Sequence, residues 1–166
     1  LRDRLLAKPD LLETEVWRLF EVETSAFAFD WQRRFPNLPA DHESWPQALA
    51  RLAAAGALDR QRLLDASLDA LWVMDNGTVL GNFCRFHALL APSVDEEDAR
   101  AGHYAELLRH RAGPVVGFAL PRIAALVGRG RLTLEELLPR LAAVFELKAK
   151  SHPLAALKLV ARGAKG

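Results

Sequence analysis

The chain has 166 residues, of which 51% are hydrophobic and 26% charged, and its formal net charge is +1 at pH 7. This composition excludes a disordered chain, and the length suits one globular domain that buries roughly two-thirds of its unfolded surface. Leu and Ala are abundant while β-branched residues are sparse, so an all-α fold is expected.

Caps and apolar spacing predict helices along most of the chain. Ser44, Ser93 and Thr133 each stand before an apolar periodic run and are expected to cap a helix. Pro121 and Pro139 fall inside helical patterns, where each should remove a backbone hydrogen bond and kink its helix. An irregular segment is expected at 24–41. The predicted helices span 10–20, 44–56, 58–74, 78–92, 93–110, 113–128, 133–147 and 151–163.

Two stretches of the chain resemble each other. "ALARLAAAGALDRQRLLDASLDALW" (48–72) and "ALPRIAALVGRGRLTLEELLPRLAAVF" (119–145) share an opening Ala-Leu-x-Arg, a turn with glycine and a later Leu-Leu pair. The offset between them grows from 71 to 74, which predicts a turn three residues longer in the second copy. A two-helix unit buries only one side of each helix and must stack on a neighbour. The expected architecture is therefore an α-solenoid of about eight helices, and a compact α-helical bundle is the alternative.

Four segments carry a resemblance to a known kind of protein: "WRLFEVE", "WPQALARLAAAGALDRQRLLDASLDAL", "FHALLAP" and "VVGFALPRIAAL". They resemble a bacterial family of uncharacterised proteins built from HEAT-like helical repeats. The resemblance implies a scaffold fold over most of the chain from residue 17 onward. It brings no established activity and no catalytic residues. Family members are typically longer, and the chain starts at Leu1 rather than Met, so we expect a fragment of a longer protein.

The segment "CRFHALL" (84–90) places the only cysteine three residues before a histidine. A reactive thiolate needs an electropositive, partly exposed setting, and a zinc site needs three or four ligands. Cys84 and His87 instead share a helix side with Leu80, Phe83 and Leu90. We therefore interpret the pair as part of a buried helix face, and we expect no metal, no cofactor and no catalytic residue in the chain.

Other motifs give no reason to expect an enzyme. The sequence lacks a phosphate loop, a dinucleotide glycine pattern and a serine nucleophile elbow. The acidic run 95–98 is explained by the positive end of its helix dipole. Four tryptophans are expected to pack in the core or between hairpins rather than to stack on bases: Trp17, Trp31, Trp45 and Trp72.

Charge is distributed unevenly along the chain. Residues 1–108 carry 11 Lys/Arg against 18 Asp/Glu, a balance of −7, and residues 109–166 carry 11 against 3, a balance of +8. Such an asymmetry suggests either an acidic partner for the C-terminal part or docking of this part on acidic residues of the same protein or of its missing remainder, and the second reading is favoured. The possible contact residues for a polyanion or another partner are Arg109, Arg111, Arg129, Arg131, Lys148 and Lys150. Since turns align along solenoid edges, Arg129, Arg131, Lys148 and Lys150 are expected to form one basic edge.

These patterns predict a non-enzymatic protein-interaction scaffold. Its partner would be another protein or the missing remainder of the same chain. A nucleic-acid-binding HEAT-like domain, using the basic C-terminal third, is the alternative. Weak non-specific nucleic-acid binding is expected of the scaffold, whereas tight binding would favour the alternative. A single cysteine and the absence of a membrane-length apolar run suggest a reducing, cytoplasmic setting with no membrane partner.

Overall fold

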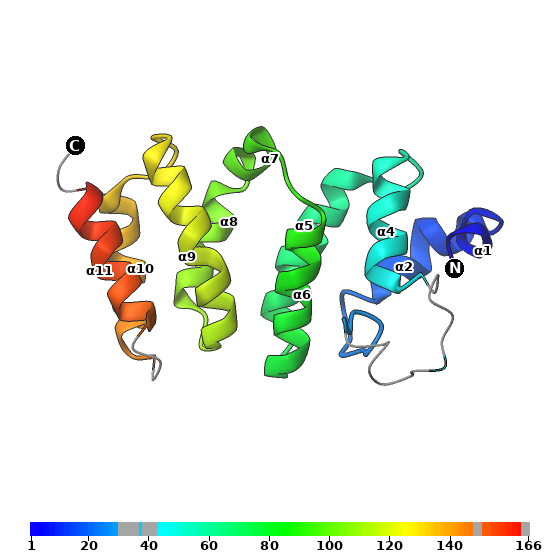
Figure 1. Cartoon of the computed structure of the whole chain (residues 1–166), viewed down its shortest axis with the longest axis horizontal. Helices are drawn as coiled ribbons and strands as arrows, with labels where there is room; N and C mark the ends of the chain where they lie inside the picture. Colours follow the sequence, from blue (N-terminus) through cyan, green and yellow to red (C-terminus); the bar gives the residue numbers. More distant parts are fainter. Residues whose placement is uncertain (30–36, 38–42, 148–150, 164–166) are drawn as a thin grey trace. The chain divides into compact units, whose positions relative to one another are not determined.

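The structure, a computed structural model, describes residues 1–29, 37, 43–147 and 151–163 (Figure 1). In these residues it holds ten α-helices, a π turn and a 3-10 turn, and no strand, so the predicted all-α class is confirmed. Whereas the sequence suggested one domain, the helices group into two compact units, Leu1–Ala91 and Pro92–Gly166. Each unit is described by itself.

The N-terminal unit is built around two long helices, α5 and α6, which pack on each other and on α4. The helices predicted at 10–20, 44–56, 58–74 and 78–92 are all present. One short helix, α1, was not predicted, because five residues are too few for a periodic pattern. The elements are α1 Arg2–Leu6, η1 Leu11–Glu15, α2 Val16–Arg18, α4 Trp45–Ala54, α5 Arg60–Val73 and α6 Gly77–Leu89.

A cluster of phenylalanines ties the irregular segment after α2 to the core of this unit. Phe27 is fully buried, with its ring centroid 4.5 Å from that of Phe83 and 4.9 Å from that of Phe86 on α6. Phe20 completes the cluster, 5.1 Å from Phe27. Such tilted aromatic pairs add stability beyond the area that they bury. The path of residues 20–28 over α6 is therefore fixed by side-chain packing rather than by regular secondary structure.

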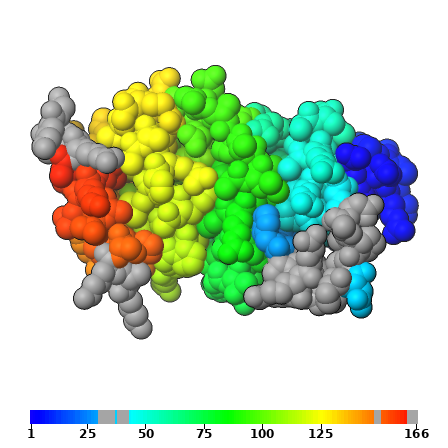
Figure 2. Space-filling view, in the orientation of Figure 1, coloured from blue at the N-terminus to red at the C-terminus, as the bar shows by residue number. Residues whose placement is uncertain are grey.

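The C-terminal unit contains α7 Val94–Ala99, α8 Ala101–Glu106, η2 Leu107–Arg109, α9 Gly113–Gly128, α10 Leu134–Phe145 and α11 Ser151–Gly163. Helices α9 and α11 lie side by side (Figure 1), and their surfaces adjoin in Figure 2. The single helix predicted at 93–110 was wrong. The structure instead has two helices, α7 and α8, divided at Arg100, which has φ −108° and ψ 16° and is only 5% exposed. No proline marks this break, and the nearest glycine, Gly102, lies two residues beyond it, in the first turn of α8.

The two stretches that resemble each other form matching helix ends. Gly56 after α4 and Gly130 after α9 both have positive φ, +74° and +70°. The residue after each glycine donates its backbone N–H to the carbonyl oxygen of the residue five positions earlier, over 2.9 Å in both copies. This is the Schellman arrangement, in which a left-handed residue ends the helix.

The turns that follow the two glycines have the same length. Two residues lie between each glycine and the next N-cap, which is Asp59 in the first copy and Thr133 in the second. The expectation of a longer second turn was therefore wrong. The three extra residues lie in the helix, because α4 ends three residues after Arg51 and α9 ends six residues after Arg122.

Two helices of the C-terminal unit contain a proline in their interior. Pro121 and Pro139 lie inside α9 and α10, yet neither proline ends its helix. Both are exposed, so the backbone carbonyl that each leaves without its N–H partner can be solvated.

None of the helices in the described residues combines the length and hydropathy that crossing a bilayer requires.

Candidate functional site

The N-terminal unit carries a groove of about 530 Å³ between the end of α2 and the outer face of α5. We call it the acidic groove. Its size lies in the range of ligand and peptide pockets. It is lined by Trp17, Phe20, Glu21, Asp59, Gln61, Arg62, Asp65, Ala66, Asp69 and Val73.

An indole and a guanidinium form one wall of the acidic groove. Trp17 is 7% exposed, and its Nε1 is buried without an acceptor in the described part of the chain. The guanidinium carbon of Arg62 lies 3.9 Å from the Trp17 ring centroid, which is a cation–π contact. Asp59 sets the position of Arg62, because its side chain accepts the N–H groups of Gln61 and Arg62 and so fixes the start of α5.

Carboxylates outnumber cations in the acidic groove. Glu21, Asp59, Asp65 and Asp69 face one guanidinium, Arg62, so four negative charges less one positive leave a formal balance of −3. Asp65 and Asp69 are four residues apart on α5, a spacing at which like charges repel. The groove therefore favours cationic groups.

Apolar surface lies at the C-terminal end of the same helix. Val73, which lines the groove, is 58% exposed, and its neighbour Trp72 is 51% exposed. The expectation that the tryptophans pack inside is thus wrong for Trp72, although it holds for Trp17. Leu64, Leu68 and Leu71 occupy the buried side of α5, and Trp72 falls just outside that stripe. Trp31 lies outside the described residues.

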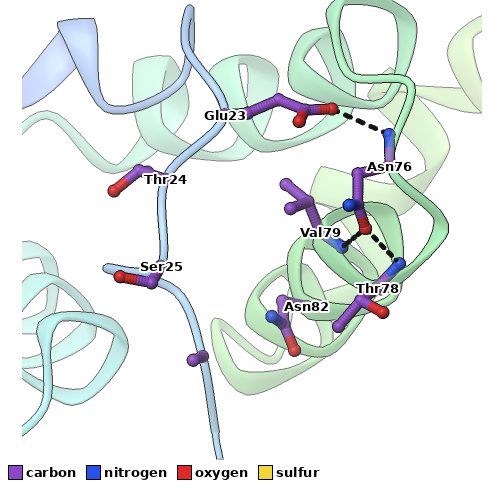
Figure 3. A pocket seen from close by; sticks show the side chains of 8 residues that line it. Glu23, Thr24, Ser25, Asn76, Thr78, Val79 and Asn82 are labelled. Carbon is purple, nitrogen blue, oxygen red and sulfur yellow. Dashed lines mark hydrogen bonds between the residues drawn. The ribbon is translucent and has the colours of Figure 1, made fainter.

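A second pocket, of about 400 Å³, lies at the start of α6 (Figure 3). We call it the polar pocket. One wall is the irregular segment after α2 and the other is the first two turns of α6. Its lining residues are Glu23, Thr24, Ser25, Ala28, Asn76, Thr78, Val79 and Asn82. Glu23 Oε1 accepts the backbone N–H groups of Asp75 and Asn76, at 3.1 and 2.8 Å, and thereby ties the two walls together.

The structure pairs two of the predicted basic contact residues with carboxylates of α7. Arg129 Nε lies 2.8 Å from one oxygen of Asp98, and Arg131 Nε lies 2.7 Å from the other. Arg129 also reaches Glu97 at 3.0 Å. The hydrogen bond from Arg131, helped by Arg129, lowers the pKa of Asp98 below its ordinary value against the opposing effect of burial. Arg129 and Arg131 do meet, but their charges are locally neutralised rather than presented as a free basic edge.

The other predicted basic residues are not brought into that network. Arg109 makes an exposed ion pair with Glu106 at 3.5 Å. Arg111 is exposed and makes no ion pair with a described residue. Lys148 and Lys150 lie outside the described residues. Arg140, which the sequence reading did not single out, binds Glu106 through Nε at 2.8 Å, and this hydrogen bond lowers the pKa of Glu106.

Cys84 and His87 lie on a buried helix face, as predicted. Cys84 is 7% exposed and His87 is fully buried, beside Phe83 and Leu80. His87 Nδ1 lies 2.7 Å from the hydroxyl of Ser67 on α5, an interaction between helices that the sequence did not predict. Among the described residues, no three His, Cys, Asp or Glu side chains gather as a metal ion would require.

Sequence reasoning missed both pockets. No motif singled out Asp65 or Asp69, and Asn82 falls on the apolar side of α6, where a lone polar residue forms no pattern. A polar residue inside an apolar stripe is the one signal that could have pointed to Asn82, because buried polar groups normally have partners.

Residues 2–151 match one protein family, described as a domain of unknown function (DUF6493). No curated protein matches the chain significantly, and neither does any solved structure.

Proposed function

We propose that this chain, which belongs to the DUF6493 family, is a non-enzymatic protein-interaction domain whose acidic groove receives a basic segment of a partner protein. The observation that carries the proposal is the groove itself. It has a formal balance of −3, an indole wall and exposed apolar surface at its end. A surface of this kind complements a segment in which basic and apolar side chains alternate along a helix.

The physics favours a protein partner over a small charged ligand. Exposed Trp72 and Val73 lose unfavourable contact with water only if an apolar surface covers them. Carboxylates around an aromatic anchor give the charged surroundings that steer a basic partner and fix its register. A non-catalytic role is proposed on the same ground: the groove offers charge and apolar area, and its described lining holds no serine, threonine, cysteine, histidine or lysine.

The scaffold architecture is part of the proposal. The helix ends at Gly56 and Gly130 have the same hydrogen bonds and are followed by turns of equal length, which supports a repeated two-helix unit. Repeats of this kind stack because one hairpin cannot bury both faces of its helices. We infer a HEAT-like helical-repeat protein in which the groove belongs to one repeat surface.

The test is a binding titration of the whole chain with a fluorescent 16-residue peptide in which Lys and Leu follow a helical pattern. We expect saturable binding that weakens as salt rises. Removing two groove charges with Asp65→Asn and Asp69→Asn together should weaken binding by about tenfold or more. Val73→Ser should weaken it without changing the salt dependence, because it removes apolar contact only.

Controls separate this groove from general charge attraction. Glu13→Gln and Asp10→Asn remove two exposed charges elsewhere in the same unit and should leave binding unchanged. A peptide of the same composition with its Lys and Leu order scrambled should bind more weakly. Equal affinity for the groove variant and the unaltered protein would contradict the proposal.

Nucleic acid is the competing partner, and it enters the same experiment as a second ligand. The ion pairs of Arg129 and Arg131 with α7 leave fewer free cations for phosphates. We expect duplex DNA to bind no tighter than about 10⁻⁶ to 10⁻⁴ M at physiological salt. Nanomolar DNA binding that is lost on reversing the charges of Arg129 and Arg131 would favour the nucleic-acid function instead.

A further inference from the structure

We propose that the polar pocket at the start of α6 binds an alkylammonium group, either a lysine side chain of a partner or a free amine. The starting point is Asn82. Its side chain lines the pocket and is 8% exposed, yet it makes no hydrogen bond with a described residue. The polar atoms of this largely buried carboxamide reach only the solvent of the pocket, because they have no partner among the described residues. A ligand in the pocket would supply the missing partner.

The backbone donors around the pocket are already used. Glu23 Oε1 accepts the N–H groups of Asp75 and Asn76, and Asn76 Oδ1 accepts those of Thr78 and Val79, at 2.9 and 3.3 Å (Figure 3). A helix start would ordinarily attract an anion through its free N–H groups. Here those groups are satisfied within the chain, and a carboxylate stands in the place that an anion would take.

Several acceptors remain unused in the pocket, beside the N–H donors of Asn82 and the hydroxyl hydrogens. Glu23 makes its two hydrogen bonds through Oε1, which leaves Oε2 available. The carbonyl oxygen of Asn82 and the hydroxyl oxygens of Ser25 and Thr78 add further acceptors on the two walls (Figure 3). No lysine or arginine lines the pocket, so its formal charge is −1. This set fits an ammonium group, which has three donors and no acceptor.

The apolar lining residues fit the remainder of the ligand. Ala28 and Val79 belong to opposite walls and would contact a short alkyl chain. Lysine has the same arrangement, with a flexible aliphatic stem that packs on apolar surface while its charge stays polar. The volume of about 400 Å³ holds a group of that size. A guanidinium would match the pocket less well, because its planar fork calls for a bidentate acceptor and Glu23 has only one oxygen free.

This site uses none of the residues that line the acidic groove, so it stands or fails separately from the proposed function. The test is an NMR titration of the ¹⁵N-labelled whole chain, followed at the backbone amides of Thr78 and Val79 and at the side-chain NH₂ of Asn82. The probes are n-butylammonium and acetyl-Gly-Lys-Gly-amide. The matched controls are acetyl-Gly-norleucine-Gly-amide, which lacks the ammonium, and acetyl-Gly-Glu-Gly-amide.

We expect saturable shifts at these three signals with the amine and the lysine peptide, and none with the two control peptides. Tighter binding of the lysine peptide would identify a protein side chain as the natural ligand, and equal binding would identify a free amine. Glu23→Gln keeps an oxygen for the N–H groups of Asp75 and Asn76 but removes the charge, and it should weaken binding by about tenfold.

Asn82→Asp adds a carboxylate where the carboxamide lies and should tighten binding of both amines. Glu13→Gln, an equal charge change on an exposed residue outside the pocket, should change nothing. Thermal unfolding of each variant separates loss of binding from loss of fold. The proposal is overturned if the glutamate peptide shifts the pocket signals, if neither amine does, or if folded Glu23→Gln binds the amines as the unaltered protein does.

Discussion

The buried side chain of Ser67 fixes the tautomer of a second buried side chain, that of His87. Its hydroxyl lies 2.7 Å from the carbonyl oxygen of Leu64 and 2.7 Å from His87 Nδ1. The hydroxyl has a single hydrogen, and a carbonyl oxygen can only accept, so that hydrogen belongs to the contact with Leu64. His87 must then donate from Nδ1, which selects the tautomer protonated there. A serine on α5 thus orients a fully buried histidine on α6.

Replacing Ser67 by alanine should destabilise the protein by about 1–3 kcal/mol, because the His87 Nδ1–H group loses its acceptor in a buried place. Chemical denaturation monitored by circular dichroism measures the free energy of unfolding. Ser25→Ala, which truncates an exposed serine of the same unit, is the control and should change stability by less than about 0.5 kcal/mol. A Ser67→Ala protein as stable as the unaltered one would show that the histidine finds another partner at no cost.

At the scale of elements, helix ends rather than helix interiors define the repeated unit. The two Schellman ends differ in every residue except the glycine and the leucine whose carbonyl accepts, Leu52 in α4 and Leu126 in α9. Both leucines are buried. An added Cβ at Gly56 or Gly130 would meet no atom within 4 Å, so the demand for glycine comes from positive φ alone.

Gly56→Ala and Gly130→Ala should therefore each lower the free energy of unfolding by roughly 1–2 kcal/mol, the cost of a left-handed conformation for an L-residue. Gly102 in α8 provides the contrast, since its φ is not positive and an added Cβ also meets nothing there. Gly102→Ala should raise stability by about 0.5–1 kcal/mol. The three variants are compared by urea denaturation at one pH. Similar effects at all three positions would contradict a conformational cause.

At the scale of the whole chain, the C-terminal unit depends on carboxylates that stay ionised. Hydrogen bonds from Arg131, Arg140 and Thr133 lower the pKa values of Asp98, Glu106 and Glu136, respectively. All three carboxylates lie in the C-terminal unit. The network of α7, α9 and α10 is thus sensitive to acid.

Acidification should unfold the C-terminal unit first. A carboxylate with a lowered folded-state pKa binds fewer protons than its unfolded form, so its contribution is complete above the ordinary values of 4.5 for Glu and 3.8 for Asp. That contribution is lost as pH falls through the lower folded values. Hydrogen exchange of residues 92–147 should therefore rise at a higher pH than the change in tryptophan fluorescence.

The fluorescence is specific because all four tryptophans precede residue 92. Asp98→Asn should flatten the pH dependence in the C-terminal unit and leave the fluorescence transition in place. Simultaneous loss of both signals at one pH, unchanged in Asp98→Asn, would contradict this assignment.

The sequence by itself determined most of the helices in the described residues, because the interactions that start and stop a helix are mainly local. Ser44, Ser93 and Thr133 cap their helices as predicted, and the structure completes each capping box with the residue three positions later, Gln47, Glu96 and Glu136. The apolar period likewise predicted the burial of Cys84 and His87. Each of these features needs only residues within about one or two turns of each other.

Only the tertiary structure decided which charged side chains form ion pairs and where pockets form. Arg129 and Arg131 counted as basic contact residues until Asp98, 31 and 33 positions away, was placed against them. Glu23 and Asn76 are 53 positions apart in the sequence. The polar pocket exists because Phe27, which lies between them in the sequence, packs into the core and holds the irregular segment on α6. Such pairings depend on how helices pack, and neither capping nor periodicity encodes which distant residue a given side chain meets.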